Sequence, residues 1–196
     1  MTASIMPACA KFHETGPIWL LAAFIALAGC TDATENDRFE LQQVTANWNS
    51  GLLKVRTEQK LLFSNEARDA LIHGVPLTLA FDFRLRDNRS QTIAAETVER
   101  FEIRYLPLSD HYQLTFLDGT PTRTYPRLRH ALADLSSVSF SLVTGALPAG
   151  EYEMLVRLRL DQTAMPPPMR LPVLLSSQWQ HDSPWSSWPL TIKPGT

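Results

Sequence analysis

Cys30 is the residue with the clearest chemistry, because it ends an apolar run that extends from Pro17 to Ala28. The tetrapeptide Leu27-Ala28-Gly29-Cys30 resembles a bacterial lipobox. In that motif the thiol takes a diacylglyceryl group, and a peptidase that requires small residues then cuts before the modified cysteine. Several acyl chains anchor a protein stably, since each buried CH₂ contributes about 0.8 kcal/mol. We therefore predict that residues 1–29 are a lipoprotein signal peptide that is removed, and that Cys30 is the lipidated N-terminus.

Two other interpretations of this leader stay open. The run could be an ordinary cleaved signal in which Cys30 stands by chance, or an uncleaved signal anchor. A transmembrane helix needs about 20 apolar residues, and Thr31 and Asp32 end this run earlier.

If Cys30 is lipidated, residues 30–38 form the lipidated cysteine and a short polar tether. The predicted location is the bacterial cell envelope, anchored by lipid and facing the periplasm, and Thr31 directly after the cysteine favours the outer membrane over the inner.

The cysteine count restricts the chemistry of the mature domain. The only other cysteine is Cys9, which would be removed with the leader. A processed and acylated chain would have no free thiol and no disulfide, which excludes thiol catalysis, thiolate metal ligation and redox exchange.

The histidines of the mature chain give no site motif, because none of them forms an HxH or HxxxH pair. Adjacent Asp110-His111 and His181-Asp182 pairs occur, but neighbours on a strand point to opposite faces. We expect these histidines to be surface residues in turns. The chain has no GxSxG elbow and no glycine-rich phosphate loop. A net charge of −2 gives no case for nucleic acid. We predict a protein without enzymatic activity, metal or cofactor, although an enzyme whose residues are assembled only by the fold stays open.

Two surface constellations are candidates for binding. The first is aromatic, with Trp179, Trp185 and Trp188 in the stretch QWQHDSPWSSWPL. Exposed tryptophan clusters mark recognition sites, although these rings could instead close one end of a sandwich. The second is basic, with Arg123, Arg127 and Arg129. It predicts contact with anionic headgroups or an acidic partner, although a solvated helix face is the alternative.

Alternation of apolar and charged residues dominates the mature chain and predicts about eight or nine short strands. One strand, beginning at Phe39, changes phase near Gln42-Gln43 and predicts a bulge there. Phe81, Phe83, Val156 and Leu158 are expected in the core, and Lys54 and Arg157 on wet faces. Two short helices are predicted, one from Glu66 to His73 with Asn65 as its N-cap, and one starting at Pro126. The run from Met165 to Pro168 is expected to be a stiff extended connector.

Strands that bury one face and wet the other are typical of antiparallel sheets. We predict a mainly β fold, an immunoglobulin-like two-sheet antiparallel sandwich with two short helices, formed by one domain at residues 39–196. The segment from Leu147 to Tyr152 resembles the turn into a late strand of such sandwiches. A partly open barrel is the alternative fold.

The C-terminal part carries a resemblance to a known family. The strand EYEMLVRLRLD, the proline-containing RLPVLL, Trp179 and the serine-tryptophan stretch ending at Trp188 resemble an uncharacterised proteobacterial family, domain of unknown function 4390. The resemblance covers Phe39 to Ile192. It implies an exported or membrane-attached protein with no assigned activity, whose genes are associated with a two-component sensor kinase. The lipobox departs from the plain leader typical of that family.

These observations predict a non-enzymatic envelope lipoprotein. Its domain would be a protein-interaction module whose partner is a periplasmic or membrane protein, such as the periplasmic part of a sensor kinase. The alternative function is a periplasmic carrier of a small molecule or lipid, in which the two sheets would part around an apolar cavity. Packed and hollow cores use the same residue types, so the alternation does not distinguish these functions.

Overall fold

The computed structural model describes residues 39–117 and 119–193, which form a mainly β domain. The predicted signal peptide, Cys30 and the tether lie outside the described residues. Within the described part, no helix has both the length and the apolar character that crossing a bilayer would require. The strands are β1 (Glu40–Asn49), β2 (Leu52–Lys60), β3 (Leu77–Asp87), β4 (Ile93–Leu106), β5 (His111–Phe116), β6 (Arg123–Tyr125), β7 (Ser137–Val143), β8 (Gly150–Leu160) and β9 (Ser186–Ile192). The helices are α2 (Asn65–Ile72), α3 (Leu128–Asp134) and α4 (Pro167–Leu175), with short 3₁₀ turns η2 (Gln162–Ala164) and η3 (Ser177–Trp179).

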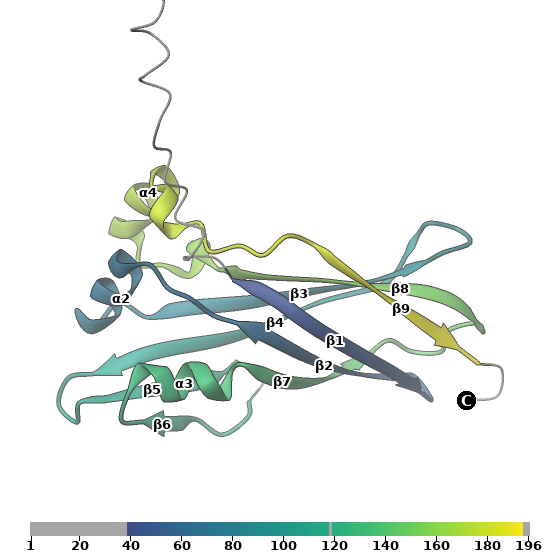
Figure 1. The fold of residues 1–196 in the computed structure, drawn as a ribbon, viewed down its shortest axis with the longest axis horizontal. Coiled ribbons are helices and arrows are strands. Elements are labelled where there is room, and N and C mark those ends of the chain that lie inside the picture. The colour runs from purple at the N-terminus through teal and green to yellow at the C-terminus, as the bar shows by residue number, and fades with distance from the viewer. Residues whose placement is uncertain (1–38, 118, 194–196) are drawn as a thin grey trace, which may run out of the picture. The chain divides into compact units, whose positions relative to one another are not determined.

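The strands form two antiparallel sheets (Figure 1). One sheet has three strands in the order β1-β2-β7, and the other has six in the order β6-β5-β4-β3-β8-β9. This confirms the predicted two-sheet antiparallel sandwich. The structure differs from the prediction in having three α-helices among the described residues instead of two.

The core lies between the two sheets and follows the predicted alternation. Phe81 and Phe83 of β3 and Val156 and Leu158 of β8 are fully buried, as predicted. They lie on central strands that have neighbours on both sides, which removes their inward faces from water. Phe140 of β7 reaches across from the three-stranded sheet, with its ring centroid 5.1 Å from that of Phe81 and 4.8 Å from that of Phe83.

The first hairpin shows how local sequence sets strand register. The β1–β2 register shifts between Leu41 and Gln43, which confirms the predicted bulge. The bulge lets the inward face change from odd to even positions along β1. Ser50 and Gly51 make the turn with φ values of 49° and 86°. Two successive positive φ values match the twist of the flanking strands, and glycine adopts them without steric cost.

Three helix predictions need correction. Helix α3 starts at Leu128 with Arg127 as its N-cap, not at Pro126. The N-cap of α2 is Ser64, not Asn65, because the Ser64 hydroxyl accepts a hydrogen bond from the Ala67 amide. Pro167 and Pro168 are not part of an extended connector, because they occupy the first turn of α4. Proline is tolerated there since the first helical amides have no partner within the helix, and its fixed φ suits the helix.

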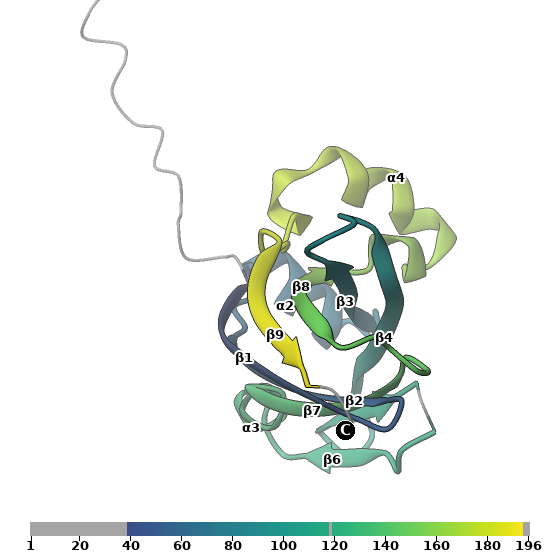
Figure 2. The same ribbon diagram turned by 90° about the vertical axis from the view of Figure 1, so that its right-hand side faces the viewer.

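The two long sides of the sandwich differ. On one side, β1 of the small sheet lies beside β9 of the large sheet (Figures 1 and 2). On the other side, the small sheet ends at β7. The predicted immunoglobulin-like turn lies at the start of β8, where the Tyr152 hydroxyl donates a hydrogen bond to the Pro148 carbonyl at 2.9 Å. A tyrosine bonding back to the backbone a few residues upstream is a recurrent feature of sandwich corners.

Candidate binding groove

The last strand of the small sheet, β7, has a free edge. It pairs with β2 on one side, and no other described strand pairs with it. The Gln59 amide donates to the Ser136 carbonyl, and the Thr144 amide donates to the Gly51 carbonyl. Hydrogen-bonded pairs alternate in an antiparallel ladder, so the bonded positions between these two contacts are Val138, Phe140 and Leu142. The amides and carbonyls of the remaining residues therefore project from the free edge: Ser137, Ser139, Ser141 and Val143.

This edge lacks the devices that usually protect exposed strands. Charged side chains, prolines and bulges keep most edges from pairing with other chains. The outward positions of β7 hold three serines and one valine, with no charge and no proline. The backbone groups of β7 are therefore accessible to an added strand.

A groove of about 460 Å³ runs between β7 and the strands of the large sheet. Its floor is aromatic, because Phe140 of β7 meets Phe101 of β4, and Phe101 meets Phe116 of β5. The ring centroids of Phe101 and Phe116 are 4.8 Å apart, and those of Phe101 and Phe140 are 5.8 Å apart. Both pairs are edge-on, which is a favourable arrangement for aromatic rings. The floor is thus aromatic, next to an edge that offers hydrogen bonds, while Glu99 and Thr120 also line the groove.

The rim of the groove is charged. Arg123 of β6 donates to the Asp134 carboxylate at 2.7 Å, and Tyr125 donates to the same oxygen at 2.6 Å. The hydrogen bond to Asp134 raises the pKa of the Arg123 guanidinium. Burial, and then the hydrogen bond to Asp134, raise the pKa of the Tyr125 hydroxyl. The guanidinium of Arg123 also lies 5.4 Å from the centroid of the Phe116 ring. Arg123 is therefore held at the rim as a fixed positive charge.

The side of the sandwich where the groove lies stays open toward the C-terminal end of β7. The first half of β4, before Phe101, pairs with β3 but has no second partner strand in the described part of the chain. Its inward residues Ala95 and Thr97 are only half-buried. Between them and β7 lies a gap of about 20 Å³, which is also lined by Leu53 and Met154. The free edges of β7 and β4 thus border one open side of the sandwich.

The structure brings one of the three predicted arginines to this groove. Arg123 lies on the rim, whereas Arg127 and Arg129 are exposed at the start of α3. The Nε of Arg129 lies 3.3 Å from Nε2 of His130, its neighbour along the chain. Arg127 and Arg129 therefore fit the solvated helix face that was the alternative to a basic binding patch.

The three tryptophans do not share one surface, which corrects the predicted aromatic cluster. Trp179 is only 7% exposed and packs in the core. Trp188 is half-buried and lies opposite Met154, on the inward face of β9. Trp185 is also half-buried, and the guanidinium groups of Arg84 and Arg157 both lie over its ring, 4.6 and 4.8 Å from the ring centroid. These rings are close in sequence but lie on different elements: Trp179 ends η3, Trp185 directly precedes β9, and Trp188 lies within β9.

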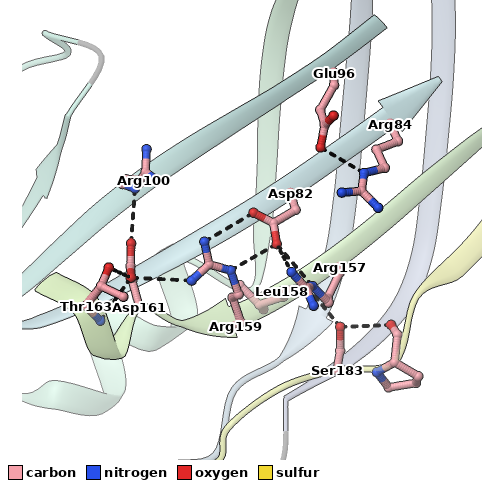
Figure 3. Close-up of polar contacts among 11 residues, drawn as sticks. Asp82, Arg84, Glu96, Arg100, Arg157, Leu158, Arg159, Asp161, Thr163 and Ser183 are labelled. Carbon is pink, nitrogen blue, oxygen red and sulfur yellow. Dashed lines mark hydrogen bonds and ion pairs between the residues drawn. The ribbon is translucent and has the colours of Figure 1, made fainter. Parts of the chain in front are cut away.

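The arginine that Trp185 contacts, Arg157, belongs to a ladder of charged residues on the outer face of the large sheet (Figure 3). Arg157 and Arg159 both donate to the Asp82 carboxylate, at 2.6 and 2.9 Å. Burial would raise the pKa of Asp82, but the hydrogen bonds from Arg159 and Arg157 outweigh it and lower that pKa. Arg157 lies on the outer face of the sheet, as predicted, but its side chain is only 32% exposed and is paired with the buried carboxylate of Asp82.

The ladder ends at Asp161, directly after β8. Its carboxylate accepts from the Thr163 hydroxyl at 2.6 Å and from Arg100 at 3.2 Å (Figure 3). Burial opposes the charged form, but the Thr163 and Arg100 contacts prevail and lower the pKa of Asp161. These charges satisfy one another, so the ladder fastens the chain that follows β8 to the large sheet.

The histidine expectations also change. His181 is 1% exposed, so it is not a surface residue in a turn. Its Nε2 accepts a hydrogen bond from the Ser64 amide at 2.8 Å, and its ring contacts Phe39 and Phe63. Its role is to join the start of α2 to the chain before β9. Within residues 39–117 and 119–193, no three histidine, cysteine or acidic side chains are grouped as metal ligands would be.

Sequence reasoning identified the buried residues of β7 but did not identify its edge. Alternation alone does not show which strand ends a sheet, because that depends on long-range pairing. One signal was present: the wet faces of β2, β3, β4 and β8 carry charged residues, whereas the wet face of β7 carries serines.

A family model matches most of the chain. The family model described as domain of unknown function (DUF4390) matches residues 36–189. No curated protein and no solved structure matches the chain.

Proposed function

The chain belongs to the family described as domain of unknown function (DUF4390), and from that premise we propose that it is a non-enzymatic lipoprotein of the bacterial cell envelope that binds a partner protein. The observation that carries this proposal is the free edge of β7 beside an aromatic groove. Strand addition at such an edge gives affinity through main-chain hydrogen bonds and specificity through pockets for alternate side chains.

The groove indicates what kind of partner segment would fit. An extended chain paired with β7 would place every second side chain over the rings of Phe101, Phe116 and Phe140. Its remaining side chains would face solvent beside the serines of β7. The partner is therefore an extended segment with alternating apolar residues. The resemblance to a family associated with sensor kinases makes the periplasmic part of a two-component sensor kinase the first partner to test.

Anchoring would favour such an interaction. A lipidated Cys30 would hold the domain at the membrane at high local concentration, so that even a weak binder is occupied. The apolar gap between the sheets near Leu53 and Met154 measures about 20 Å³, a volume that suits a single water and not an acyl chain. A lipid carried at that gap would require the sheets to part. The groove beside β7 is larger, about 460 Å³, but it lies next to an unprotected strand edge, which favours a partner strand over a carried lipid.

The proposal is tested by photo-cross-linking in living cells. A photoreactive amino acid at Ser141, on the free edge, should capture a specific envelope protein. The same amino acid at Glu151, which is exposed on β8, is the matched control and should not capture it. Equal capture from both positions would contradict the groove as the site, and capture of a lipid at Ser141 would favour the carrier.

A proline variant tests the strand-addition mode itself. Ser139→Pro removes one amide from the free edge and leaves the β2–β7 ladder intact, because that amide points away from β2. One hydrogen bond contributes about 0.5–1.5 kcal/mol, and the variant loses that contribution to strand addition. The proline ring also hinders the added strand sterically. We expect cross-linking from Ser141 to fall several-fold, whereas Ser139→Thr should retain it. Unchanged capture in the proline variant would exclude main-chain pairing at β7.

A further inference from the structure

Helix α4 is apolar on two faces. Val173 is buried in the core, and Met169 packs against it. The outward side chains are Leu171, Leu174 and Leu175, which are 72%, 58% and 87% exposed. Residues at i, i+3 and i+4 lie on one face of a helix, so the three leucines form one continuous exposed patch. We call this patch the leucine face.

The leucine face has the chemistry of an interfacial helix. Contiguous exposed apolar patches mark sites of contact with proteins or membranes. The only charged residue of α4 is Arg170, which is exposed and whose Nε donates to the Met165 carbonyl at 3.0 Å. Helices that lie in a membrane interface combine apolar residues such as leucine with basic ones. A cation without a neighbouring acid on the helix also suits anionic lipid headgroups.

The position of α4 selects the membrane as the occupant. Figure 1 places α4, α2 and the start of β1 at the same end of the sandwich. Phe39, which directly precedes β1, lies with its ring centroid 5.5 Å from that of His181, two residues after η3. Nine residue steps separate Cys30 from Phe39, and a fully extended chain of that length spans roughly 30 Å. A lipid anchor at Cys30 would therefore hold this end of the domain close to a bilayer.

We propose that the leucine face of α4 docks on the surface of the lipid bilayer that holds the anchor. This inference rests on the proposed lipidation of Cys30, which brings the helix within reach. Docking would fix the orientation of the sandwich, with the turn at Ser50 and Gly51 directed away from the bilayer. The free edge of β7 would then be presented at a defined height and angle, instead of rotating freely on a tether.

The test places an environment-sensitive fluorophore on the full-length acylated protein. One variant is Leu175→Cys, on the leucine face, and the matched control is Lys54→Cys, which is exposed on the outer face of β2. Both are reconstituted into vesicles of phosphatidylethanolamine and phosphatidylglycerol, with and without brominated acyl chains. We expect brominated lipid to quench the probe at position 175 several-fold more than the probe at position 54. Equal quenching would overturn the docking.

Mass spectrometry of the same preparations separates this inference from the anchor. An acylated Cys30 with equal quenching at both positions leaves the proposed anchor standing and rejects the docking. If Cys30 is not acylated, the anchor fails, and docking is judged from co-sedimentation with the same vesicles. The protein should then pellet several-fold more than its Leu171→Ser/Leu174→Ser/Leu175→Ser variant, and equal pelleting would reject the docking. Circular dichroism of the triple variant must match that of the parent, since these side chains are exposed.

Discussion

The outer faces of the two sheets differ in how far their charges are already paired. On the six-stranded sheet, Asp82 binds Arg157 and Arg159, and Asp161 binds Arg100. On the three-stranded sheet, no salt bridge joins described residues across β1, β2 and β7. Its outer face carries Lys54 and Arg56 opposite the serines of β7.

This difference separates the scaffold from the proposed binding surface. Charges that satisfy one another fix a sheet and add little for a partner, because their hydrogen bonds are already made. Unpaired cations, serine hydroxyls and edge amides are available for new contacts. The six-stranded sheet therefore acts as the scaffold, and the three-stranded sheet presents the free edge. The variants below test that division, from the largest expected effect to the smallest.

Truncation of Phe140 should have the largest effect, because this ring joins the free strand to the scaffold through contacts with Phe81 and Phe83. Removing a buried phenylalanine typically costs about 3–5 kcal/mol. We expect Phe140→Ala to lower the free energy of unfolding, measured with urea, by that amount. The control is Val143→Ala on the same strand, which is 86% exposed and should change stability by less than about 0.5 kcal/mol. Similar losses in both variants would mean that β7 is not joined to the scaffold in this way.

Neutralising Asp82 should have the next largest effect. Asp82→Asn leaves Arg157 and Arg159 facing a side chain that no longer carries a charge. Unsatisfied groups of this kind cost about 1–3 kcal/mol. Glu96→Gln is the control, since its pair with Arg84 is exposed on both sides and such pairs contribute about 0–1 kcal/mol. If cross-linking from Ser141 fell in the folded Asp82→Asn protein, the scaffold and the binding surface could not be treated as separate.

A lower pH should destabilise the scaffold through the carboxylates of Asp82 and Asp161. The pKa values of Asp82 and Asp161 are lowered in the fold, so the folded state holds these protons less tightly than the unfolded state, where the pKa of aspartate is about 3.9. Their stabilisation is complete above that pKa and is lost as the pH falls through the lower folded values. We expect urea-unfolding free energies to fall below about pH 4. A chain with Asp82→Asn should show a shallower decline, and an identical slope would remove Asp82 as a cause.

The smallest effect on stability is expected from proline at the free edge. Ser139 and Arg56 face each other across β7 and β2 on the same side of the sheet. The Ser139 amide points to the open edge, whereas the Arg56 amide points toward β1. We expect Ser139→Pro to change the unfolding free energy by less than about 1 kcal/mol, because no ladder bond is lost. Arg56→Pro should cost several-fold more in the same denaturation experiment. Equal costs would show that the β7 edge is not free.

Much of the fold was predictable because alternation reports which face of a strand is buried. The bulge after Leu41, the turn at Ser50 and the core positions of Phe81 and Val156 follow from local sequence. The environment of Arg157 was not predictable, since its partner Asp82 lies 75 positions earlier. Long-range pairing, not local pattern, decides which charged residues form ion pairs.

The same limit applies to the candidate site. Arg123 was identified from its basic neighbourhood, but the groove it borders is assembled from Phe101, Phe116 and Phe140 on three strands. Trp179 and Trp185 are six positions apart, and the excursion between β8 and β9 places one in the core and the other on the outer face. Pro167 and Pro168 were expected to be extended because proline runs favour that form in isolated chains, whereas packing of Met169 and Val173 onto the core stabilises the helix instead.

The unprotected edge of β7 also bears on how the purified protein behaves in solution. An edge that accepts a partner strand also offers its main-chain groups to the same edge of a second copy, because backbone hydrogen bonds do not depend on side-chain identity. We therefore expect concentrated preparations without a partner to self-associate and to form β-rich aggregates over time. A single lysine at Ser141 should lengthen their useful lifetime in solution, for the reason that natural sheets place charges at exposed edges.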